Sequence, residues 1–186
     1  HRSFVTRHVK KHVKRSGKAA VVAHGAILGG CIEIGNREES RYLISYVIEG
    51  ATPMRDFENP DRWDKVALHY EKTAHPFTAR FAETALAQVP LNARSHVLDV
   101  AAGTGALTLA AARTGAQVLA IDFSPAMVAR IAAAGLSNVD AKVMDGQALA
   151  LPNGSFDAVF SIFGVIMFPD WRKGLAEMAR VTRPGG

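Results

Sequence analysis

The sequence predicts an α/β fold in which a parallel, doubly wound sheet carries helices on both faces. Two observations support this prediction. From residue 96 onward, short apolar runs alternate with Ala- and Leu-rich stretches of helical spacing, and the connections between them are short and rich in Gly, Pro, Ser and Asn. Strands that alternate with helices in this way are joined by right-handed crossovers and therefore pair in parallel. At 186 residues, the chain is long enough to bury one sizeable core.

Each element follows from a local pattern. The expected strands cover residues 96–100, 117–121, 139–143 and 157–162. The helices expected between and after them cover residues 105–113, 125–134 and 171–181. Ser124 is the expected N-cap of the second of these helices, and Gly115 and Gly135 are placed to end the first two.

Residues 54–92 predict a helical lid region in front of a core at residues 93–186. Apolar residues recur at helical spacing along one face of a first helix: Trp63, Val66, Ala67 and Tyr70. Asn59 supplies an N-cap for this helix, and Pro60 stands in its first turn. A second helix is expected from Pro76 to about residue 88, with its apolar side formed by Phe77, Phe81, Ala85 and Leu86.

The excess positive charge lies in residues 1–53, an atypical basic and apolar segment. It holds nine basic and four acidic residues, whereas residues 54–186 hold 13 of each. The core therefore gives no electrostatic indication of a nucleic-acid partner. Three interpretations of the segment stay open: sequence upstream of the true start and outside the native domain, a basic arm for anionic partners, or a targeting segment.

Cysteine usage and hydropathy bear on the compartment. The one cysteine, Cys31, excludes an internal disulfide framework and suits a reducing compartment. No apolar run reaches the roughly 18 residues that a membrane-spanning helix needs. No group of His, Cys and Asp has the spacing of metal ligands, so no metal is expected. We therefore expect a cytoplasmic protein without a membrane span, and its oligomeric state stays open.

The turn after the first expected strand carries the strongest chemical signal, Asp99-Val-Ala-Ala-Gly-Thr-Gly105. Glycines allow a ligand to approach the backbone, and sheets of this type bind ligands at the carboxyl ends of their strands. A dinucleotide-binding turn needs Gly or Ala three residues after its second glycine, where this chain has Thr108. The acid Asp99 disfavours an anionic pyrophosphate and favours a ligand that carries ammonium and sulfonium groups. Alternatively, Asp99 is a buried carboxylate that accepts hydrogen bonds from turn amides.

Two further acids follow strands. Asp122 ends the second strand, where a carboxylate can accept both hydroxyls of a ribose. Its alternative role is to cap the helix that opens at Ser124. Asp145 follows the third strand and is placed to accept an adenine amino group, with the amide of Gly146 or Gln147 facing a ring nitrogen. The alternative is an Asp-Gly turn without a ligand.

In order and spacing, these landmarks resemble the class I S-adenosylmethionine (SAM) dependent methyltransferases, particularly the small-molecule group that includes ubiquinone- and menaquinone-type enzymes. The resemblance covers about residues 60–186. Leu98-Asp-Val-Ala-Ala-Gly-Thr-Gly105 resembles the first motif of the family, with Ala102 where the family often has Cys, and Ala120-Ile-Asp-Phe-Ser-Pro-Ala-Met127 resembles the second. Residues 145–152, 155–161 and 175–186 resemble the adenine-side segment, the fourth strand, and the helix and turn that lead to a fifth strand.

The resemblance implies a Rossmann-like sheet that binds SAM and lacks its C-terminal strands, so that one strand edge is open. The residues expected at the cofactor are Asp99, Ala101, Gly103, Gly105, Asp122, Phe123, Met127, Asp145, Gly146, Gln147 and Ser161. For Phe123 and Met127, core packing is an equal alternative.

The acceptor implied by the resemblance is a small molecule, and the apolar segment at residues 163–169 favours a hydrophobic one. Tyr70, His69 and His75 are candidates for substrate contact or proton removal, and no catalytic residue is assigned. Two other functions stay open at this point: a nicotinamide-dependent oxidoreductase on a similar fold, and a non-catalytic SAM-fold fragment.

Overall fold

The computed structural model describes residues 20–22 and 57–186. Its strands are β1 (Ala20–Val22), β2 (His96–Val100), β3 (Gln117–Asp122), β4 (Val139–Val143) and β5 (Ala158–Ile162). Its helices are α3 (Pro60–Leu86), α4 (Ala106–Ala112), α5 (Pro125–Ala132), the short 3-10 helix η2 (Val165–Met167) and α6 (Trp171–Val181). The strands form one sheet in the order β1-β5-β2-β3-β4, and every pair is parallel.

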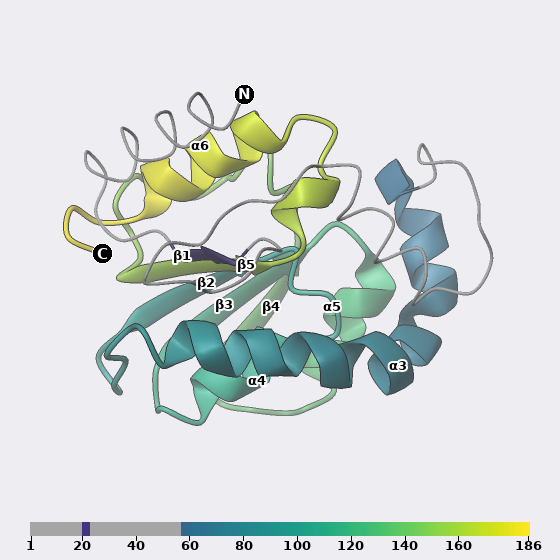
Figure 1. The fold of residues 1–186 in the computed structure, drawn as a ribbon, viewed down its shortest axis with the longest axis horizontal. Coiled ribbons are helices and arrows are strands. Elements are labelled where there is room, and N and C mark those ends of the chain that lie inside the picture. Colours follow the sequence, from purple (N-terminus) through teal and green to yellow (C-terminus); the bar gives the residue numbers. More distant parts are fainter. Residues whose placement is uncertain (1–19, 23–56) are drawn as a thin grey trace.

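Helices cover both faces of the sheet, as the sequence predicts. Helix α6 lies on one face, and α4 and α5 lie with α3 on the other (Figure 1). The central strands are almost entirely buried between these layers, with Leu98, Ile121 and Phe160 among the largest fully buried side chains. Because all strands are parallel, their carboxyl ends meet at one edge of the sheet, where ligands of such folds bind.

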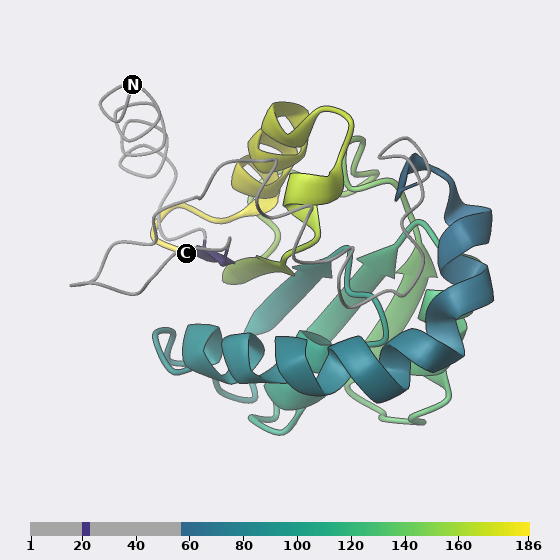
Figure 2. The ribbon, with the colours of Figure 1, turned by 45° about the vertical axis from the view of Figure 1, so that its right-hand side comes forward.

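The N-terminal helical region differs from the prediction. Residues 60–86 form one helix, α3, rather than two, and Pro76 lies inside it. An interior proline removes a backbone donor and bends a helix, at a cost of about 3 kcal/mol. Helix α3 is visibly bent (Figures 1 and 2), and it packs against both α5 and α4. These contacts with two neighbouring helices offset the cost and hold α3 continuous through the proline.

The caps and bounds of most elements agree with the sequence. The Asn59 side chain accepts a hydrogen bond from Asp61 N at 2.9 Å, and that of Ser124 accepts one from Met127 N at 3.2 Å. Strands β2 and β4 and helix α6 have the predicted bounds. Gly115 and Gly135, with φ of 85° and 63°, adopt the left-handed conformation that ends helices.

Strand β1 comes from the segment at residues 1–53 and lies beside β5. It pairs Ala20 with Phe160 and Val22 with Ile162. The expectation of an open edge at β5 is therefore wrong along these residues, because the backbone of β1 pairs with it there. The rest of that segment, including Cys31, lies outside the described residues. The three interpretations of the segment concern those residues and stay predictions.

Two features are absent from the residues that the structure describes. None of their helices combines the length and apolar character needed to cross a membrane. Nor do they contain a group of three or more His, Cys, Asp or Glu side chains that could hold a metal ion.

Candidate functional site

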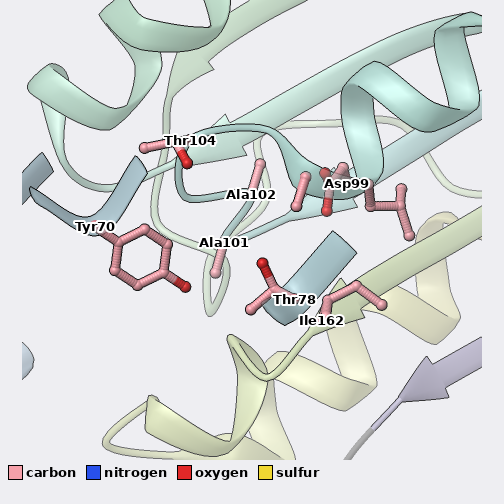
Figure 3. A pocket seen from close by; sticks show the side chains of 9 residues that line it. Tyr70, Thr78, Asp99, Ala101, Ala102, Thr104 and Ile162 are labelled. Carbon is pink, nitrogen blue, oxygen red and sulfur yellow. The ribbon is translucent and has the colours of Figure 1, made fainter. Parts of the chain in front are cut away.

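A pocket lies at the carboxyl edge of the sheet, beside the glycine turn (residues 101–105) that joins β2 to α4. Figure 3 shows its lining, which α3, β2, the glycine turn, α4 and β5 contribute: Tyr70, Thr78, Asp99, Ala101, Ala102, Thr104, Ala106, Leu107 and Ile162. Asp99 is the one carboxylate in this lining, which includes no Lys or Arg of the described chain. The pocket therefore suits a cationic ligand better than an anionic one.

The backbone of the glycine turn takes an uncommon conformation. Gly103 and Gly105 have φ of 57° and 88°, and Ala101, which is not a glycine, has φ of 54°. A left-handed conformation costs a residue with a Cβ about 1–2 kcal/mol. Phe163, directly after β5, has φ of 62°. Strained backbone of this kind gathers at ligand sites, and both non-glycine examples lie at the carboxyl ends of neighbouring strands.

Asp99 is buried behind the turn, with 1% of its surface exposed. Its Oδ2 accepts hydrogen bonds from Thr108 N at 3.0 Å and from Thr108 Oγ1 at 2.6 Å. Burial raises the pKa of Asp99 to about 7, and the two bonds from Thr108 oppose that rise. Asp99 therefore accepts a backbone amide at the start of α4, close to its expected structural role, and its contact with a ligand stays a prediction. Thr108, the residue that departs from a dinucleotide-binding turn, is the partner of Asp99.

Asp122 lies against the glycine turn, at the end of β3. Its Oδ2 accepts a hydrogen bond from Gly103 N at 2.8 Å, and its Oδ1 accepts one from Ser124 N at 3.0 Å. Burial raises its pKa, and the amide hydrogen bonds oppose the rise. The capping alternative for Asp122 is wrong, because the Ser124 side chain caps α5.

The predicted adenine-side residues form a compact turn after β4. Asp145 is exposed, and its Oδ1 accepts a hydrogen bond from Gln147 N at 2.8 Å, as in the alternative Asp-Gly turn. Gly146 is buried: a Cβ there would stand 2.5 Å from Phe168 Cζ and 2.8 Å from Val100 Cγ1. The glycine is therefore needed for close packing of Phe168, a contact that the sequence did not reveal.

Three other predicted cofactor residues present little or no side-chain surface to a ligand. Met127 is 1% exposed and Ser161 is fully buried, because both pack into the core. The core-packing alternative therefore describes Met127. Ser161 Oγ accepts a hydrogen bond from Val165 N at 2.9 Å and so holds η2 in place. Gly105 is buried, and a Cβ there would lie 3.0 Å from Ile131 Cγ1. Phe123, just past β3, stays partly exposed.

The three acceptor-side candidates, Tyr70, His75 and His69, differ in their burial and in their contacts with the glycine turn. The Tyr70 ring lies beside Gly103, where an added Cβ would come within 3.4 Å of its Cε1. Burial, followed by the charges of Asp122 and Asp99, raises the pKa of Tyr70 to about 12. His75 is half-buried, and its Nδ1 lies 2.8 Å from Thr104 Oγ1. Burial lowers the pKa of His75. His69 is exposed, and neither His69 nor His75 is part of the pocket lining, although His75 contacts the lining residue Thr104.

Sequence reasoning missed Thr78 and Ile162 in the pocket lining. Thr78 stands two helical turns after Tyr70 on α3, so a single uninterrupted helix would have brought it to the same face. Ile162 ends β5 and points into the pocket (Figure 3). Thr78 was missed because two helices were predicted in place of one. Ile162 was missed because its apolar side chain resembles that of any core residue.

The family model and several of the curated relatives that match this chain are described as methyltransferases. Residues 97–186 match the family model described as "Methyltransferase domain". The chain is 44% identical over 99 residues to the demethylmenaquinone methyltransferase of Corynebacterium efficiens, a match that covers 53% of this chain and 42% of that protein.

Solved structures give the same result for the fold. A structure titled "[4+2]-Cyclase SpnF" aligns with a TM-score of 0.55 and 30% identity, over 58% of this chain and 42% of the other. A SAM-dependent methyltransferase from Aquifex aeolicus aligns with a TM-score of 0.50 and 27% identity, over 55% of this chain and 58% of the other. The chain spans about half the length of the curated relatives it matches.

Proposed function

Because this chain belongs to the class I SAM-dependent methyltransferases, we propose that it transfers the methyl group of SAM to a small-molecule acceptor. The observation that carries the proposal is the pair of buried carboxylates, Asp99 and Asp122, on either side of the glycine turn. The family match to residues 97–186 includes both carboxylates and the turn between them.

The chemistry of these residues fits SAM. Its methionine end carries a positive sulfur and an ammonium group, and the pocket presents Asp99, the Tyr70 hydroxyl and no basic side chain of the described chain. Its ribose carries two hydroxyls, for which the Asp122 carboxylate is an acceptor at the end of β3. A pyrophosphate would instead meet two carboxylates and be repelled.

We assign the binding roles on this basis. Asp99 and the glycine turn with Ala101 hold the methionine end, Asp122 holds the ribose, and the turn at residues 145–147 with Phe123 contacts the adenine. SAM supplies a methyl group that is already activated for transfer. The work left to the protein is to orient the two reactants and exclude water, and Tyr70 and the bent helix α3 are suited to both tasks.

The acceptor is proposed to be an apolar small molecule. Phe77 and Phe81 of α3 pack against Phe163, with ring centroids 6.0 and 4.9 Å from it, next to the pocket residues Thr78 and Ile162. Phe77 is partly exposed, so the aromatic cluster has a free surface toward solvent. Relatives named demethylmenaquinone methyltransferases support an apolar acceptor. We expect the reaction in the cytoplasm, where SAM is available.

His75 is the side chain best suited to accept a proton from such an acceptor. Its lowered pKa keeps the imidazole neutral at neutral pH, and its Nδ1 is beside Thr104 in the glycine turn. Tyr70, with its raised pKa, stays protonated and therefore does not act as a base. We therefore propose His75 for proton removal and Tyr70 for positioning.

The proposal predicts that the chain binds SAM and S-adenosylhomocysteine. Isothermal titration calorimetry with each ligand measures this directly, and NADH serves as the competing ligand. Absence of binding at about millimolar SAM, a free energy weaker than about 4 kcal/mol, would contradict the proposal. Tighter binding of NADH than of SAM would revive the oxidoreductase alternative.

A second function on the same fold is chemistry other than methyl transfer. The similarity to a structure titled as a cyclase favours this second function as an alternative. A chain that binds SAM but transfers a radiolabelled methyl group to no acceptor in a broad screen of quinols, phenols and amines would support this alternative.

Asp99 predicts a specific pH dependence of stability. Its pKa is raised from 3.8 to about 7 in the folded chain, so on unfolding at intermediate pH it releases a proton. Its contribution to stability is present below about pH 4 and is lost as the pH rises toward 7. Asp99→Asn keeps an oxygen acceptor for Thr108 and carries no charge. We expect urea unfolding to show that Asn stabilises the chain by about 1–3 kcal/mol more at pH 7 than at pH 5.

The exposed acid Asp140 offers a control for this measurement, since Asp140→Asn leaves the pH dependence of the wild type in place. A parallel pH dependence in wild type and Asp99→Asn would show that Asp99 is ionised in the folded chain throughout this range. The expected effect on SAM is opposite in sign: Asp99→Asn should weaken its binding at pH 7, because a bound cation favours the charged carboxylate.

A further inference from the structure

Asp64 of α3 contacts the start of α5, far from it in sequence. Its Oδ1 accepts hydrogen bonds from Ser124 Oγ at 2.5 Å and from Ala126 N at 2.9 Å. A carboxylate at this place satisfies free amides of the helix start and interacts favourably with its dipole. By themselves, these two hydrogen bonds only connect α3 to α5 and do not affect a ligand.

Ser124 extends the contact into the cofactor site. Ser124 N donates to Asp122 Oδ1 at 3.0 Å, and Gly103 N donates to Asp122 Oδ2 at 2.8 Å. Asp64, Ser124, Asp122 and Gly103 thus form a hydrogen-bonded series from α3 to the glycine turn, and its inner members are almost completely buried. We call this series the Asp64 relay. Because Ser124 binds both acids, its position and that of Gly103 together orient the Asp122 carboxylate.

Helix α3 reaches the same turn by a second route. Tyr70 stands on α3 six residues after Asp64, and its ring lies beside Gly103 on the pocket side (Figure 3). Displacing the start of α3 from α5 would therefore move the Tyr70 ring and release Ser124 together. Any loosening of α3 from α5 would move the Tyr70 ring, whereas only the loss of Asp64 would remove the acceptor of Ser124 Oγ.

We propose that Asp64 is a positioning residue for cofactor binding, acting through Ser124 on Asp122. This inference rests on the proposed function, because Asp122 is taken to hold the ribose. Asp64 also contributes to the rise in the pKa of Asp122, after the larger effect of burial. Its charge is therefore a cost at Asp122, and its value to the site lies in its oxygen acceptor.

A second tie between the same helices provides a matched control. Glu71 of α3 forms an ion pair with Arg130 of α5, at side-chain exposures of 36% and 40%. This pair holds α3 on α5 but has no bond to Ser124 or Asp122. If α3 is merely fastened to α5, removing either tie should have a similar effect on SAM.

The experiment measures the affinity of the 186-residue chain for SAM by calorimetry in four variants and a double variant. Asp64→Ala is expected to weaken binding about tenfold, equivalent to about 1.4 kcal/mol. Asp64→Asn, whose amide oxygen can accept both hydrogen bonds, should stay within about threefold of wild type, and Glu71→Ala within about twofold. Asp122→Ala removes the member of the relay that is proposed to hold the ribose. Adding Asp64→Ala to it should change the affinity by less than about threefold, since residues in one hydrogen-bond network are not additive.

Each outcome separates the inference from the proposed function. A wild-type chain without SAM affinity would overturn the proposed function itself. A wild-type chain that binds SAM, with Asp64→Ala unchanged or with equal losses in Asp64→Ala and Glu71→Ala, would overturn the role of Asp64. A full tenfold loss in the Asp122→Ala background would also overturn it, because Asp64 would then act by another route. If Asp64→Ala does not fold, Ser124→Ala tests the same relay, and an unchanged affinity there is equally decisive against it.

Discussion

Replacing Asp122 with alanine is expected to weaken SAM binding by about 1.5–3 kcal/mol, the scale of hydrogen bonds to a charged group. The carboxylate lies at the end of β3, beside the glycine turn, where it is proposed to accept the ribose hydroxyls. Alanine also leaves the amides of Gly103 and Ser124 without their acceptor, so the turn loses part of its orientation. Titration calorimetry with SAM and S-adenosylhomocysteine should show equal losses for both, because the two ligands share the ribose.

Asp140→Ala is the control for this measurement. Asp140 is an exposed acid on β4 that pairs with Lys142 and is not part of the pocket lining. The Asp140→Ala substitution should leave the affinities for SAM and S-adenosylhomocysteine unchanged. Thermal unfolding of each variant establishes that it is folded at the temperature of titration. Wild-type affinity in folded Asp122→Ala would remove Asp122 from the cofactor site.

Replacing Arg180 with alanine is expected to lower the free energy of unfolding by about 2–3 kcal/mol. The guanidinium of Arg180, on α6, donates to Leu149 O at 2.9 Å, to Leu151 O at 2.8 Å and to Asn153 Oδ1 at 2.7 Å. It also pairs with Glu177, 2.7 Å away, whose other oxygen accepts from Leu149 N. One side chain therefore fastens the segment after the Asp145 turn to α6.

Urea denaturation of Arg180→Ala, Arg180→Lys and Lys173→Ala checks this expectation. Lysine lacks the planar fork of donors and should recover less than half of the loss. Lys173 is exposed on the same helix, and its removal should change stability by less than about 0.5 kcal/mol. A change of that size in Arg180→Ala would show that the network contributes nothing net.

The same network has a pH signature. The hydrogen bonds from Arg180 hold the pKa of Glu177 below its usual range. The resulting stability is present above the ordinary pKa of a glutamate and is lost as the pH falls through the lowered value. Arg180→Ala should therefore lose less stability than wild type on acidification.

The core elements were predictable because their information is local. An apolar run such as Val97–Val100 is a strand wherever it is buried, and Ser124 and Gly135 define the limits of a helix through their own backbone preferences. The alternation of strands and helices places Asp99, the glycines and Asp122 at the carboxyl ends of neighbouring strands. Family likeness over residues 97–186 agrees with this part of the chain.

The helix α3 was not predictable in the same way. Pro76 is a local signal to end a helix, and its cost is overridden by contacts with α4 and α5, which come later in the sequence. The same applies to β1, whose pairing with β5 joins residues more than a hundred positions apart. Interactions at such separations have no trace in a local pattern.

For the candidate site, the sequence by itself determined which residues stand at the strand ends: Asp99, the glycine turn and Asp122. Only the tertiary structure decided which of the others face the pocket. It buried Met127 and Ser161 in the core and packed Phe168 on Gly146. It also brought Tyr70 and Thr78 of α3 to the pocket and Asp64 to the start of α5. The physical reason is that strand ends are specified by the chain order, whereas the direction of a side chain depends on what packs against it.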